Sequence, residues 1–161
     1  MKKLLFLLCL LSWSALNAQK TINRPPFIAK ATETIEIAAV HLSDTATVID
    51  VDAKFTPKYW IRIAPATCLV ADNGERYQVR QGVGIELGQE FWMPESGEAT
   101  FSLIFPPLPP SVKSFDFVEG EGERDFNLFG ISLTGKLPKL QLPKGLELSL
   151  IHISEPTRPE P

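Results

Sequence analysis

The sequence has 161 residues, with 16 Lys and Arg against 19 Asp and Glu, so its formal net charge is −3. This length is enough for one domain with a buried core. A mildly acidic chain without basic clusters does not fit nucleic-acid binding, which depends on phosphate neutralisation by Lys and Arg.

Residues 1–18 are laid out as a secretory signal peptide. Met1-Lys2-Lys3 supplies a positive start, the apolar run Leu4–Leu16 is too short to span a bilayer with its flanks, and the bond after Ala18 offers a cleavage point. We therefore expect a chain exported to the periplasm or cell envelope that begins at Gln19. We expect no membrane contact after the leader is removed.

Residues 19–33 are expected to form an extended leader, because Pro25-Pro26 prevents a helix there. Strand patterns begin at Thr34. Residues 34–42 are rich in β-branched and small residues, and residues 47–55 alternate between apolar and charged side chains. This alternation predicts a sheet with one buried face, to which the second segment contributes Ile49, Val51, Ala53 and Phe55.

The pattern continues along the chain. Residues 59–63 place Tyr59, Ile61 and Ile63 on the face opposite Trp60 and Arg62. Residues 68–71 and 76–80 flank the sequence Asp-Asn-Gly, which is typical of a tight turn between two strands. Further strands are expected at 99–105, 114–119 and 127–134.

Large apolar side chains are spread over many of these segments. Each is worth roughly 1.5–3 kcal/mol when fully buried, and two facing sheets hide them together where one open sheet does not. The set comprises Phe55, Ile61, Phe101, Leu103, Phe105, Phe115, Phe117 and Leu133. We therefore predict that residues 34–136 form an all-β, immunoglobulin-like antiparallel β-sandwich of about seven to eight strands.

The end of the chain departs from this pattern. Residues 137–147 have the Pro- and Lys-spaced composition of a linker. Residues 148–158, LSLIHISEPTR, resemble an in-frame translation of a transposase adapter used to prepare sequencing libraries, so residues 148–161 are excluded from the fold and are expected to be disordered. We expect the native chain to continue past Glu147, and His152 is not a candidate ligand or base.

Few residues are suited to nucleophilic catalysis. Without the leader and the tail, His41 is the one remaining histidine and Cys68 the one remaining cysteine. His41 is expected to be solvated or hydrogen-bonded. Cys68, in the apolar run TCLV, is expected to be a buried structural thiol, since nothing next to it in the sequence would lower its pKa. No catalytic residue is predicted.

Two segments are candidate ligand sites. Asp50 and Asp52 share one strand face and, with the acidic loop 119–125, supply enough oxygen atoms for calcium, but the loop lacks the ordered spacing of a known calcium loop. Gly82–Gly88 is not a dinucleotide fingerprint, because its third glycine is displaced and no helix follows. Solvated strands and turn glycines explain both, and we predict neither metal nor cofactor.

Trp60 and Trp92 are the candidate binding residues. Trp60 lies on the polar face of its segment, and Trp92 stands beside Met93 and Pro94. Two exposed indoles on a sandwich would stack on sugar rings or dock another domain. The alternative is that both belong to the core. The run Pro106–Pro110, PPLPP, is either a polyproline ligand or, as we expect, an extended connection between strands.

Several stretches carry a resemblance to a known family. They are YWIRIA at 59–64, the turn at 72–77, GIEL at 84–87, EFWMPESGE at 90–98, KSFDFVE at 113–119 and FGI at 129–131. With these, the segment Ile35–Lys136 resembles the N-terminal β-sandwich region of secreted Bacteroidetes thiol:disulfide oxidoreductases of the TlpA-like type, which carry a thioredoxin-like domain after the sandwich.

The resemblance implies that the redox chemistry and the sandwich belong to separate domains. In that family a Cys-x-x-Cys pair at a helix N-terminus performs the redox chemistry, and this sequence contains no such pair. It implies a non-catalytic accessory domain of a protein-disulfide reductase, whose partners would be its own C-terminal domain, protein substrates or a second copy of the chain. The alternative is a free-standing secreted binding module for glycan or protein that uses Trp60 and Trp92.

Overall fold

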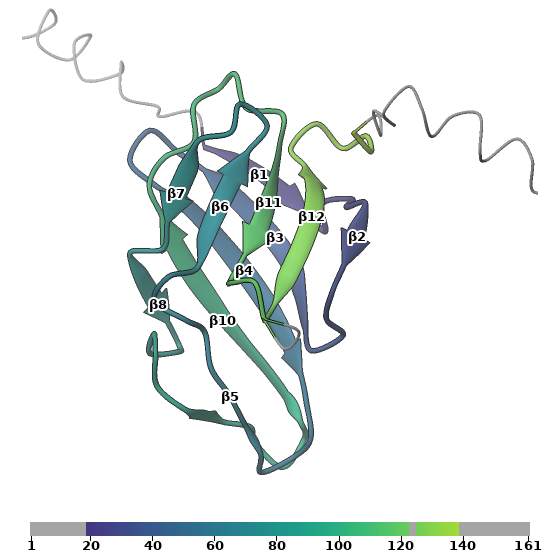
Figure 1. Ribbon diagram of the computed structural model, residues 1–161, viewed down its shortest axis with the longest axis vertical. Helices are drawn as coiled ribbons and strands as arrows, with labels where there is room; N and C mark the ends of the chain where they lie inside the picture. The colour runs from purple at the N-terminus through teal and green to yellow at the C-terminus, as the bar shows by residue number, and fades with distance from the viewer. Residues whose placement is uncertain (1–18, 123–124, 139–161) are drawn as a thin grey trace, which may run out of the picture.

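The computed structural model describes residues 19–122 and 125–138. The predicted signal peptide, Glu123-Arg124, most of the predicted linker and the adapter-like tail fall outside these residues. The described residues form no helix and therefore contain no helix that could cross a membrane. They form antiparallel strands in two five-stranded sheets and one two-stranded ribbon (Figure 1).

The first sheet runs in the order β1-β3-β4-β10-β8. Its long central strands are β3 (Ile35–Leu42), β4 (Thr47–Lys54) and β10 (Glu98–Phe105), and its edges are β1 (Lys20–Asn23) and β8 (Gln81–Val83). The predicted alternation holds in β4, where Ile49, Val51 and Ala53 are buried and the residues between them are not. Phe101, Leu103 and Phe105 of β10 face the same side.

The second sheet runs in the order β2-β12-β11-β6-β7. Its strands are β2 (Ala29–Lys30), β6 (Cys68–Ala71), β7 (Arg76–Gln78), β11 (Ser114–Val118) and β12 (Asn127–Ser132). The predicted Asp-Asn-Gly turn joins β6 to β7, and Gly74 supplies the positive φ of 85° that such a turn requires.

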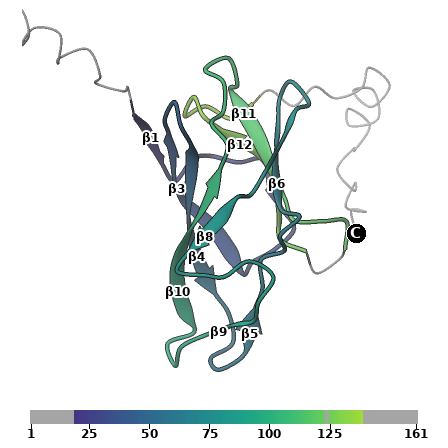
Figure 2. The same ribbon diagram turned by 90° about the vertical axis from the view of Figure 1, so that its left-hand side faces the viewer.

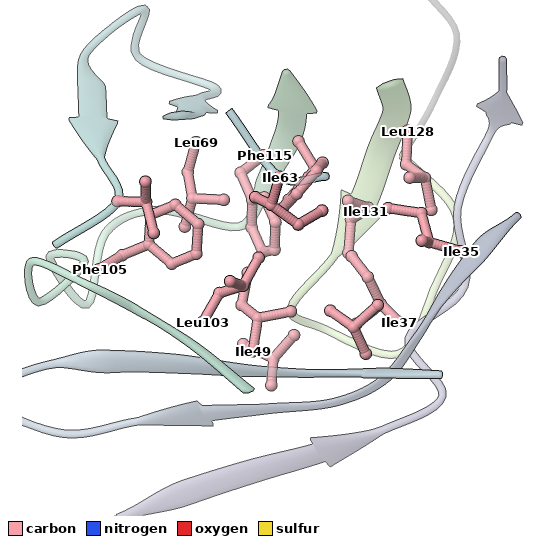
Figure 3. Close-up of a cluster of buried hydrophobic side chains, with 14 of the residues drawn as sticks. Ile35, Ile37, Ile49, Ile63, Leu69, Leu103, Phe105, Phe115, Leu128 and Ile131 are labelled. Atoms are coloured by element: carbon pink, nitrogen blue, oxygen red, sulfur yellow. The ribbon is translucent and has the colours of Figure 1, made fainter. Parts of the chain in front are cut away.

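One core fills the space between the two sheets. The edge-on view shows the layers facing each other (Figure 2), and isoleucine, leucine and phenylalanine side chains from both interdigitate between them (Figure 3). Phe105 of β10 meets Phe117 of β11 edge to face, with ring centroids 6.4 Å apart. The all-β antiparallel sandwich is therefore confirmed, while the immunoglobulin-like assignment stays a prediction.

The strand count was wrong, because residues 19–122 and 125–138 form twelve strands where seven to eight were expected. The four additions are β1, β2, β8 and β9 (Phe91–Trp92), each two to four residues long. Strands this short are too short to show a hydrophobic period of two. They form because they pair with a neighbouring strand. Two of them lie in the segment expected to be an extended leader: β1 pairs with β3 in one sheet, and β2 pairs with β12 in the other.

Two aromatic residues were assigned to the wrong face. Phe55, predicted to be in the core, is 39% exposed, because β4 ends at Lys54 and the chain then turns. Tyr59 is exposed although Ile61 and Ile63 are buried as expected. The strand β5 covers only Trp60–Ile61, so the alternation predicted for 59–63 does not extend to Tyr59.

Truncation of Phe117 tests the shared core. Phe117→Ala should lower the free energy of unfolding by about 3–5 kcal/mol, the usual cost of removing a buried phenylalanine. Phe129→Ala removes a ring that is 39% exposed in the same sheet and should cost less than about 1 kcal/mol. Urea unfolding measures both. Equal losses would contradict a core centred between the sheets.

Candidate functional site

The two predicted tryptophans are neighbours in space. β5 and β9 form a two-stranded antiparallel ribbon in which Trp60 pairs directly with Trp92. Residues opposite each other on two strands project from the same face, with Cβ atoms about 4.5–5.5 Å apart. Trp60 is 41% exposed and Trp92 60% exposed, so neither belongs to the core. Sequence reasoning named both residues but not their pairing.

The other face of the ribbon anchors it to the sandwich. Ile61 pairs with Phe91 on that face, and Ile61 and Met93 are almost fully buried. The Phe91 ring lies 6.4 Å from the ring of Phe101 in β10. Burial of these apolar groups forces the alternate residues, the two tryptophans, outward.

Tight turns hold the outer end of the ribbon. The N–H of Tyr59 donates to the Thr56 carbonyl, and Lys58 between them has a positive φ of 62°. In the facing loop the N–H of Gly97 donates to the Pro94 carbonyl. Gly97 has a φ of 70°, and a Cβ there would lie 2.6 Å from the Phe55 carbonyl oxygen, so only glycine fits.

Exposed aromatic side chains gather at this end. We call Phe55, Tyr59, Trp60 and Trp92 the aromatic tip; together they make up four of the six exposed aromatic residues in the part of the chain that the structure describes. Two ion pairs lie beside them, Lys58–Glu95 at 2.9 Å and Lys54–Glu98 at 3.2 Å. Arg62 and Glu90 also flank the ribbon, so the three positive charges of residues 54–62 are matched by the three negative charges of residues 90–98.

His41 belongs to a polar row across the outer face of the first sheet. Its Nε2 lies 2.8 Å from Asp50 Oδ2, and its Nδ1 lies 3.0 Å from Thr21 Oγ1. The Ser102 hydroxyl donates to the other Asp50 oxygen at 2.6 Å. Asp50 therefore stands between His41 and Ser102. A serine nucleophile needs its base in direct contact, so this order is not a catalytic triad.

The pKa of Asp50 reflects this row. Partial burial raises the pKa, but the hydrogen bonds from Ser102 and His41, together with the charge that His41 carries when protonated, outweigh it and bring the pKa below its ordinary value of 3.8. The row thus favours the carboxylate form and ties β1, β3, β4 and β10 together.

Asp50 and Asp52, the two aspartates weighed as calcium ligands, already have partners. Asp50 holds His41 and Ser102, while Asp52 pairs with Arg24 at 3.3 Å. Glu119 lies at the end of β11 in the second sheet. No cluster of three His, Cys, Asp or Glu residues suited to a metal ion occurs among residues 19–122 and 125–138.

Glu119 is a buried carboxylate that accepts hydrogen bonds from two separate backbone segments. One oxygen accepts the N–H of Ala64 at 2.7 Å and the other accepts the N–H of Phe126 at 2.8 Å. Burial raises the pKa of Glu119, and these two N–H donors offset only part of that rise. Glu119 thereby connects the segment after β5 to the loop between β11 and β12.

Cys68 is buried, as predicted, but a cation stands beside it. The hairpin of β6 and β7 brings the Arg76 guanidinium to 3.6 Å from Cys68 Sγ. Local sequence had shown no such cation, because Arg76 approaches only when the strands pair. Cys68 is 7% exposed, so access to the thiol is restricted.

The remaining motifs have structural explanations. Within Gly82–Gly88, Gly84 and Gly88 take positive φ values of 83° and 78° in the loop after β8, as turn glycines do. The PPLPP run connects β10 to β11, and the N–H of Leu108, a buried residue in its middle, donates to Thr47 Oγ1. It is a connection between strands, as expected, and it joins the two sheets.

Comparisons with known proteins add no relative. No protein-family model, curated protein or solved structure matches the chain.

Replacement of Glu119 tests its structural task. Glu119→Gln should lower the free energy of unfolding by about 1–3 kcal/mol, because the amide NH₂ cannot accept from a backbone N–H. Glu121→Gln, an exposed change in the same loop, should cost less than about 0.5 kcal/mol. Urea unfolding at neutral pH compares them. A neutral Glu119→Gln would show that the two N–H groups have other acceptors.

The polar row predicts a defined pH dependence. A carboxyl group whose folded pKa is lowered contributes stability above its unfolded pKa and loses it as the pH falls through the folded pKa. The stability difference between the natural chain and Asp50→Asn should therefore be full above pH 3.8 and shrink below it. Ser102→Ala should raise the Asp50 pKa in an NMR titration. A difference independent of pH would rule out this assignment.

Proposed function

We propose that this chain is the non-catalytic accessory β-sandwich of an exported thiol:disulfide oxidoreductase and that the aromatic tip is its contact surface. The resemblance of Ile35–Lys136 to the sandwich of that family supports the first part, and the antiparallel sandwich agrees with it. The signal-peptide layout of residues 1–18 supports export to the periplasm or cell envelope. Thiol chemistry would belong to a thioredoxin-like domain of the parent protein.

The exposure of the Trp60–Trp92 pair carries the binding part of the proposal. Tryptophan is the residue with the most to gain from burial, and a fold that turns two of them outward side by side leaves apolar area for a partner to cover. The anchored inner face and the tight turns present the indoles in a preformed arrangement, which lowers the entropy cost of binding.

The position of the aromatic tip suits an external partner. In Figures 1 and 2 the ribbon lies at the lower end of the molecule, whereas the described chain enters and leaves at the upper end. The Lys20 ammonium donates to the Leu133 carbonyl there, so β1 and the end of β12 lie together. A domain attached after Pro138 would join the sandwich at the end opposite the aromatic tip.

A free-standing glycan-binding module is the second candidate. The direct pairing of Trp60 with Trp92 favours it, because indoles on one face of a ribbon offer apolar planes on which sugar rings stack. In this case the sandwich would act without a redox domain.

Two measurements separate these functions. Genomic sequence read past Glu147 should continue into a thioredoxin-like frame with a Cys-x-x-Cys pair, whereas a stop codon within a few residues would favour the free-standing module. Glycan-array binding that is lost in Trp60→Ala or Trp92→Ala would favour the module as well.

The accessory role also predicts the absence of redox activity in this chain. It should not reduce insulin disulfides with dithiothreitol as electron donor beyond the rate of dithiothreitol alone. Cys68→Ser should leave that rate unchanged. Reduction above the background rate by either protein would contradict the proposed division of labour.

A further inference from the structure

We infer that the partner of the aromatic tip is the interface of a lipid bilayer with zwitterionic headgroups. This inference rests on the proposed function, because it names what the contact surface contacts. It replaces the expectation, drawn from the sequence, that the chain leaves the membrane once its leader is removed. The arrangement of the exposed aromatic residues is the reason to expect membrane contact.

The aromatic tip includes exposed rings besides the tryptophan pair. Trp60 and Trp92 share the outer face of the ribbon, and Tyr59, which precedes β5, is 63% exposed. Phe55 is exposed where β4 ends. A sugar ring covers one flat face and would leave Tyr59 and Phe55 in water. A bilayer interface surrounds an inserted end from all sides.

The residue types suit the headgroup region. Tryptophan and tyrosine concentrate at both membrane–water interfaces, where the ring is buried and the N–H or O–H stays hydrated. The turns at Thr56–Tyr59 and Pro94–Gly97 form this end of the molecule. Turn backbone carries polar groups that the hydrocarbon core does not satisfy, so the aromatic tip inserts only to the interface.

Charge selects the kind of lipid surface. Each lysine beside the aromatic tip is paired with a glutamate, Lys58 with Glu95 and Lys54 with Glu98. A neutral surface gains nothing from an anionic leaflet, which attracts clusters of unpaired Lys and Arg. Apolar burial therefore drives the contact, and it is insensitive to salt because screening acts only on charges.

Intrinsic fluorescence tests the inference directly. Of the three tryptophans, Trp13 lies in the leader, so a chain that begins at Gln19 reports only from Trp60 and Trp92. Added phosphatidylcholine vesicles should shift its emission to the blue, and brominated phosphatidylcholine should quench it. The effect should persist at high salt and should not increase with anionic lipid.

Variants test whether the aromatic tip is responsible. In vesicle sedimentation, Trp60→Ala and Trp92→Ala should each weaken partitioning about tenfold, and the double variant should not sediment. Phe129→Ala removes an aromatic ring of similar exposure to Phe55 outside the aromatic tip and should partition as the natural chain does. Thermal unfolding confirms that each variant is folded.

Three results would overturn the inference. They are no emission shift or quenching with vesicles, equal loss in Phe129→Ala, and binding only to anionic vesicles at low salt. If vesicles fail but a soluble neutral polysaccharide or a purified protein substrate shifts the tryptophan emission, the aromatic tip remains a contact surface with a different partner. If neither does, the proposed function fails as well.

Discussion

Burial of two apolar sheet faces against each other is the constraint on which the rest of the molecule depends. Phe105 and Phe117 meet at its centre, one from each sheet. Because each sheet gives one face to the core, ligands are left with the outer faces, the ends and the loops. The ribbon of β5 and β9 is divided in the same way. Its inner face joins the core through Ile61, and its outer face is exposed to solvent.

Long strands were predictable from sequence and short ones were not. The eight residues of β4 and of β10 are long enough for a period of two to show, and the Asp-Asn-Gly turn has its own chemistry. β2 and β9 have two residues each, and nothing local distinguishes them from loop. Phe55 was misplaced because the alternation continues one residue past the last pair of the ladder, Lys54 with Glu98.

The candidate site was predictable residue by residue but not as an arrangement. Trp60 stood out on the polar face of its segment and Trp92 beside Met93 and Pro94. Their pairing, however, depends on the register of two strands that begin 31 positions apart. The same limit applies to His41 with Asp50 and to Cys68 with Arg76. Cross-strand neighbours follow from register, and register is set by the whole sheet.

The sandwich buries its apolar residues efficiently except at the aromatic tip, and we assign the function to that end. Acrylamide quenching of tryptophan emission, in a chain that begins at Gln19 and is free of any ligand, tests this most directly. We expect acrylamide to quench both indoles in the folded chain, since Trp60 is 41% and Trp92 60% exposed. A blue-shifted emission resistant to acrylamide would place Trp60 and Trp92 in the core and contradict it.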